Sequence, residues 1–121
     1  MAFTFDKKTN KITCPRGNNG AFNIDINGIE LGEGDVVEFY VRDPAMPGRL
    51  ISIVQQITDG ECVISLDSAV TSLLPPGRYK WNLRIITAPE YGDGDELITA
   101  EGSANSITVW NIAPDFVVLE V

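Results

Sequence analysis

The chain has 121 residues, the size of one domain, and we expect a single domain over residues 1–121. Its 17 acidic and nine basic residues give a net charge of −8, which disfavours binding to nucleic-acid phosphates and to anionic membrane surfaces. No apolar run approaches the roughly 20 residues of a transmembrane helix, and the first residues lack the pattern of a secretory signal peptide. We therefore expect no nucleic-acid partner, no membrane partner and no signal peptide.

Alternation of apolar and polar residues recurs along the chain and predicts antiparallel strands with one buried face. It starts with a hairpin over 3–13 and continues over 22–27, 37–42, 62–66 and 107–110. Clusters of glycine, asparagine, aspartate and proline separate these stretches and supply turn conformations. Strands spaced about ten residues apart predict a sandwich or a barrel.

Only residues 67–74 read as helical. Asp67 or Ser68 is placed to cap a helix, and Pro75 ends it, so we expect about one helical turn.

The stretch "LLPPGRYKWNLRI", residues 73–85, stops this turn and begins a central strand. In immunoglobulin-like sandwiches a tyrosine near the start of such a strand returns its hydroxyl to the backbone a few residues upstream. Tyr79 is placed for this tyrosine corner, with its partner expected within residues 72–77. Trp81 should fill the space between the sheets, and its indole N–H needs a partner. The alternative is an ordinary strand that begins with two aromatic residues.

Two cysteines remain, Cys14 and Cys62. Each shares strand parity with apolar neighbours, so we expect two buried free thiols that behave as small hydrophobes. One disulfide between them is the alternative.

The order of these motifs resembles the small immunoglobulin-like domains of tailed-phage and prophage structural proteins, of which the N-terminal domain of the baseplate upper protein is one type. Asn18 departs from the pattern, since an aspartate is usual there. The resemblance implies a non-enzymatic virion protein of the tail or baseplate, located in the virion and made in the bacterial cytoplasm, with other virion proteins as partners and a homo-oligomer as one form of assembly. It rests on the following residues: Arg16, Gly17, Phe22, Ile24, Gly34, Asp35, Val37, Phe39, Val41, Thr71, Leu74, Pro76, Gly77 and Tyr79.

Chemistry-bearing residues are few. The chain has no histidine, which excludes Ser-His-Asp and Cys-His nucleophilic sites and the usual zinc sites. Glu30, Glu33 and Asp35 are the candidates for acid–base work, but their loop has no apolar surroundings in sequence. The acidic residues at 93–96 lack the spacing of a calcium loop and are better explained as a hairpin tip. We expect no catalytic, cofactor or metal residues.

Tyr40 and Trp110 fall at outward-facing positions of their strands, where an aromatic ring stacks on sugars or lies in an interface. The segment "APDFVVLEV" is almost wholly apolar, and such a segment pairs either with its own sheet or with another chain. The candidate interface residues are Trp110, Phe116, Val118 and Leu119, and the alternative is that both termini complete the chain's own sandwich.

The fold expected from these observations is an immunoglobulin-like antiparallel β-sandwich of seven to nine strands with one short helical turn near 67–74. A carbohydrate- or receptor-binding module is the alternative function. A host-encoded accessory domain is the third.

Overall fold

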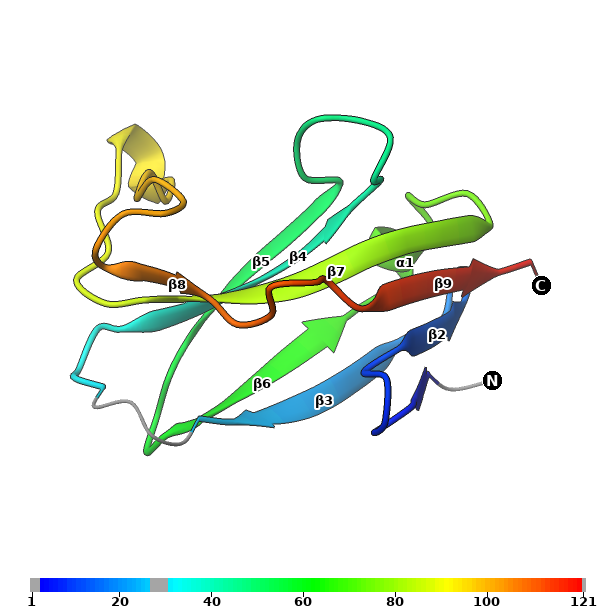
Figure 1. Ribbon diagram of the computed structural model, residues 1–121, viewed down its shortest axis with the longest axis horizontal. Helices are drawn as coiled ribbons and strands as arrows, with labels where there is room; N and C mark the ends of the chain where they lie inside the picture. Colours follow the sequence, from blue (N-terminus) through cyan, green and yellow to red (C-terminus); the bar gives the residue numbers. More distant parts are fainter. Residues whose placement is uncertain (1–2, 27–30, 121) are drawn as a thin grey trace.

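The computed structural model describes residues 3–26 and 31–120, and these residues form a two-layered β-sandwich (Figure 1). The predicted all-β fold is confirmed, with nine strands in two sheets among the described residues. The larger sheet holds β1 (Thr4–Phe5), β2 (Ile12–Pro15), β4 (Val36–Arg42), β5 (Ile51–Gln56), β7 (Gly77–Ile86), β8 (Ser106–Thr108) and β9 (Asp115–Leu119). The smaller sheet pairs β3 (Gly20–Asp25) with β6 (Glu61–Leu66), and the helical segments are α1 (Ser68–Thr71) and the 3-10 turn η1 (Asp93–Asp95).

The order of strands in the larger sheet is β1-β2-β9-β7-β4-β5. Because β4 occupies one edge of β7, both β8 and β9 pair with the other edge. This arrangement matches immunoglobulin-like sandwiches, in which strands G, F, C and C′ share one sheet and strands B and E share the other. One pair departs from the antiparallel expectation: β2 and β9 run parallel, because the chain leaves β2 for the opposite sheet and reaches β9 only at its end.

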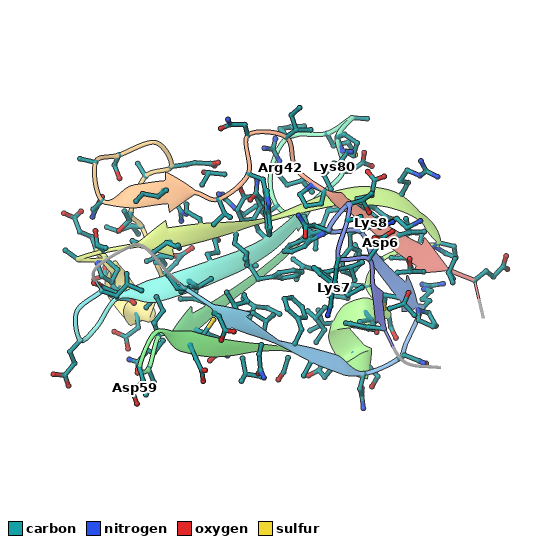
Figure 2. The ribbon with its side chains drawn as sticks, turned by 60° about the horizontal axis from the view of Figure 1, so that its bottom comes forward. Asp6, Lys7, Lys8, Arg42, Asp59 and Lys80 are labelled. Atoms are coloured by element: carbon teal, nitrogen blue, oxygen red, sulfur yellow. The ribbon has the colours of Figure 1, made fainter. Side chains whose placement is uncertain are left out.

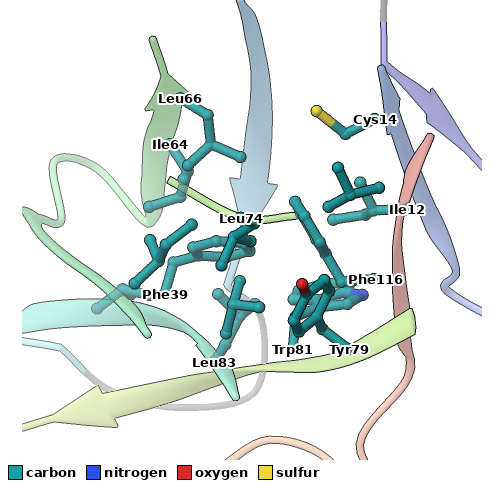
Figure 3. Close-up of a cluster of buried hydrophobic side chains, with 14 of the residues drawn as sticks. Ile12, Cys14, Phe39, Ile64, Leu66, Leu74, Tyr79, Trp81, Leu83 and Phe116 are labelled. Carbon is teal, nitrogen blue, oxygen red and sulfur yellow. The ribbon is translucent and has the colours of Figure 1, made fainter. Parts of the chain in front are cut away.

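The core lies between the sheets and is filled by alternate side chains of each strand. Trp81 and Phe39 are almost completely buried at its centre, with ring centroids 5.5 Å apart. Figure 3 shows how side chains from both layers converge there: Ile12, Cys14, Phe39, Ile64, Leu66, Leu74, Tyr79, Trp81, Leu83 and Phe116. Because these residues alternate with polar ones along most strands, the period-two pattern predicted the inner face correctly.

The predicted helical turn is also present. The Asp67 carboxylate accepts a hydrogen bond from the Val70 amide over 2.9 Å, as an N-cap residue does. Leu74, directly after the turn, is buried and closes one end of the core.

The start of β3 is closed in another way. A side-chain carbon at Gly20 would overlap the ring of Phe3, so the absence of a side chain lets the N-terminal segment fill the space between the sheets there.

Candidate interaction site

The start of β7 is fixed by the contact that the sequence predicted for Tyr79. Its hydroxyl donates to the carbonyl oxygen of Pro75 over 2.7 Å, inside the segment 72–77. Two residues on, the indole N–H of Trp81 donates to the carbonyl oxygen of Asn10 over 2.8 Å. The central strand is therefore tied both to its own preceding turn and to the N-terminal hairpin.

The C-terminal segment completes the chain's own sandwich. Strand β9 lies between β2 and β7, and its Phe116 and Val118 point into the core, where each is almost fully buried. The expectation that these two residues supply surface contacts is wrong, because β9 is an interior strand of the sheet and both side chains belong to the buried core. Leu119, at the end of β9, remains exposed.

Tyr40 also departs from the expectation. It lies on the outer face of β4, but only 4% of its surface is exposed, because the Arg49 guanidinium covers the ring at 4.3 Å from the centroid. Burial is the main cause that raises the pKa of Tyr40, and the nearby Glu101 carboxylate adds to it, so the hydroxyl stays protonated at neutral pH.

Charged groups are buried on the same face. Glu38 Oε1 lies 3.0 Å from Arg84 Nη2 and 3.5 Å from Arg49 Nε, and Ser52 donates to Glu38 Oε2. Arg84 also donates to the carbonyl oxygen of Thr99 over 2.9 Å. The loop at 43–50 and the long connection at 87–105 thus cover the outer face. Arg49 of the loop faces the Glu38 carboxylate, and the Thr99 carbonyl of the connection accepts from Arg84.

Trp110 is only partly exposed. Its ring meets that of Trp81 edge-on, with centroids 4.8 Å apart, so it packs against the core from the edge of the sheet. The Asn82 side-chain amide holds this position, donating to the Trp110 carbonyl oxygen over 3.0 Å and accepting from its N–H over 3.3 Å. The alternation of inward and outward side chains did not predict this position, because β8 ends at Thr108 and the chain changes direction before Trp110.

Two hollows lie on either side of Trp110. The first is a mostly apolar cleft of about 340 Å³ between β3 and the β7–β8 pair. Ile107 and Val109 form part of its wall and are 46% and 41% exposed, although Ile107 lies on the inner face of β8, opposite Ile85, and Val109 follows just after the strand. The full lining is Ile24, Asp25, Ile26, Val37, Leu83, Ile85, Ile107, Thr108, Val109 and Trp110.

The second hollow is a polar groove of about 330 Å³ on the outer face. Three aromatic residues, Tyr40, Trp81 and Trp110, are among its lining residues. Polar and charged groups make up most of the rest: Arg42, Lys80, Asn82, Glu101, Thr108 and Asn111.

The acidic candidates form no such site. Both carboxylate oxygens of Asp35 accept backbone hydrogen bonds, from Gly32 over 2.7 Å and from Ala88 over 3.3 Å, which ties two loops together. Glu33 is exposed, and Glu30 lies outside the described residues. Asp93 and Asp95 belong to the exposed turn η1. Within residues 3–26 and 31–120, no group of three or more acidic or cysteine side chains could hold a metal ion.

Both cysteines are free and buried, as the sequence predicted. Burial raises the pKa of Cys14 to about 11 and also raises that of Cys62. Both thiols therefore stay protonated and weakly nucleophilic near neutral pH.

Sequence reasoning missed the apolar cleft: the alternation at 107–110 gave Ile107 and Val109 an inward direction, but it carried no sign that the small sheet does not cover them. Across the described part of the chain, no helix is long and apolar enough to cross a lipid bilayer. Comparisons with protein-family models, with curated proteins and with solved structures found no match to this chain.

Proposed function

We propose that this chain is a non-enzymatic structural protein of a phage or prophage particle, part of a tail or baseplate, that works by assembly with other virion proteins. The phage assignment rests on the resemblance of its turn and strand motifs to small virion domains. The observation that carries the assembly role is the apolar cleft, where Ile107 of β8 and Val109, just after this strand, are left half exposed. Apolar surface of this kind is typical of a protein contact.

The buried polar groups support the same proposal. Glu38 and Arg84 are paired with each other, and each carboxylate oxygen of Asp35 accepts a backbone N–H, so these charged groups belong to the internal structure of the fold. A sandwich with paired interior charges and an open apolar edge suits a building block that contributes shape and contacts.

The experiment is to purify particles from a lysate of the cells that carry the gene and to quantify this chain by mass spectrometry. We expect the chain to co-sediment with particles in a fixed ratio to the other structural proteins. Its absence from purified particles, with the chain present in the unfractionated lysate, would overturn the proposal.

The polar groove favours one alternative, a carbohydrate-binding module. Sugar sites combine an aromatic platform with polar side chains, and the groove offers Trp110 beside Asn111 and Lys80. A glycan array tests this alternative. Binding to a glycan that is lost in Asn111→Ala and retained in Asn18→Ala would support it, and no binding to any glycan would refute it.

A further inference from the structure

Among the described residues the smaller sheet has two open edges, and the outer edge of β3 is the one that adjoins the apolar cleft. The sheet holds only β3 and β6, the counterparts of strands B and E, whereas immunoglobulin-like sandwiches place strand A beside strand B. Among residues 3–26 and 31–120, nothing pairs with the outer edge of β3. Figure 1 shows β3 as an outer strand of the lower layer, opposite β7 and β9.

The backbone groups on this edge are free to pair. Ile26 donates its N–H to the Gly60 carbonyl over 2.8 Å, so even-numbered residues of β3 bond to β6. The N–H and C=O groups of Ala21, Asn23 and Asp25 therefore point away from β6. An unpaired row of this kind is a template for an added strand.

The apolar cleft adjoins the second half of the same edge. An extended segment pairing with Asn23 and Asp25 would place alternate side chains over Ile107 and Val109. At the first half of the edge the N-terminal segment already fills the space between the sheets, through Phe3 against Gly20. The cleft lies farther along β3, at Ile24 to Ile26, beyond the part of the edge that Phe3 covers.

The charges around the cleft favour a basic segment. Asp25 and Glu61 face each other across β3 and β6, and like charges directly opposite destabilise a strand pair. No lysine or arginine lines the cleft. Asp59 marks the end of the sandwich where the cleft lies, because the next residue, Gly60, bonds to Ile26 of the cleft wall. Figure 2 shows the basic residues Lys8, Arg42 and Lys80 well away from Asp59.

We propose that the outer edge of β3, together with the apolar cleft, receives an extended segment of another virion protein. Residues of this segment that face the cleft are apolar, and Lys or Arg stands beside Asp25 on the outward face. This proposal rests on the proposed function, which supplies the partner. A second copy of the chain suits the site less, because each copy carries a net charge of −8.

The test uses the full chain and a fluorescein-labelled peptide, KVTVKVTVK, with EVTVEVTVE as its acidic counterpart. We expect saturable binding of the basic peptide by fluorescence anisotropy, weaker binding of the acidic one, and slower hydrogen exchange at the Ala21, Asn23 and Asp25 amides. Asn23→Pro removes the central edge N–H and should weaken binding at least about tenfold, whereas Asn23→Ala keeps that N–H and should bind like the parent. Asp25→Lys should reverse the preference between the two peptides.

Urea melts first establish that each variant is folded. No saturation up to about 1 mM peptide, or equal affinity in Asn23→Pro, overturns the proposal. Protection confined to the Thr108 amide would overturn it in favour of the β8 edge, and protection that appears without peptide as the chain dimerises would overturn it in favour of a second copy. A chain found in particles that binds neither peptide refutes this inference alone, and a peptide-binding chain absent from particles refutes the virion role alone.

Discussion

The two faces of the central strands β4 and β7 are both buried, yet they are built from different chemistry. The inner face carries Phe39, Trp81 and Leu83, which pack against the smaller sheet. The outer face carries the ion pair of Glu38 and Arg84, which loops cover instead of a sheet. The contrast teaches that alternation along a strand separates apolar from polar faces and does not by itself separate buried from exposed ones.

The largest effect should come from the inner face. Trp81→Ala removes the ring at the centre of the aromatic cluster and leaves the Asn10 carbonyl without its indole donor, so we expect a loss of about 3–5 kcal/mol in the free energy of unfolding. Urea denaturation measures it. Val63→Ala, at an exposed position of β6, is the control and should cost about 0.5 kcal/mol or less. Equal losses in the two variants would contradict the packing described for the inner face.

A smaller loss is expected when the outer face loses one charge. Arg84→Met leaves the buried Glu38 carboxylate with the Ser52 hydroxyl and with Arg49 at 3.5 Å, and should cost about 3 kcal/mol. The double variant Arg84→Met with Glu38→Leu removes both charges and should recover to within about 1 kcal/mol of the parent. If the double variant is no more stable than the single one, the outer face depends on the ion pair itself rather than on charge balance.

A single hydrogen bond at the N-terminal end of β7 should contribute less to stability than these side chains. Tyr79→Phe removes the donor to Pro75 and should lower the free energy of unfolding by about 1 kcal/mol, since a part-buried hydrogen bond is lost. Tyr91→Phe is the matched control, because Tyr91 is about half exposed and should change little. A Tyr79→Phe melt that coincides with the parent would show that this corner does not contribute to stability.

The inner face could be predicted from the sequence because its signals are local. The alternation of Val37, Phe39 and Val41 sets the inward side of a strand, and Pro75, Gly77 and Tyr79 mark its entry within a few residues of one another. Both features are properties of neighbouring residues, so no knowledge of the distant chain was needed.

The outer face depends on contacts distant in sequence. Tyr40 is buried because Arg49 and the 87–105 connection return over it, and Arg84 finds its acceptor at Thr99 only once that connection has folded. Trp110 packs against Trp81 because Asn82, 28 residues away in sequence, holds its backbone by a hydrogen bond. The cleft could not be predicted for the same reason, since it exists only where β3 ends opposite β8.

The smallest effect is expected at the exposed end of the outer face, where Lys80 and Asp115 form a second ion pair. The hydrogen bond from Lys80 is the first cause that lowers the pKa of Asp115 below its ordinary value. The stabilisation is therefore fully present above about pH 4 and is lost as the pH falls through the lowered folded-state pKa. Because both side chains are partly exposed to water, we expect Asp115→Asn to lower the free energy of unfolding by only a few tenths of a kcal/mol at pH 7. This loss should shrink as the pH falls towards 3 and should disappear in 1 M salt. Urea melts at pH 7 and pH 3, with and without salt, measure this. A loss as large as that of Arg84→Met would show that exposure does not separate the two ion pairs, and that the covering loops are not what makes the buried pair matter.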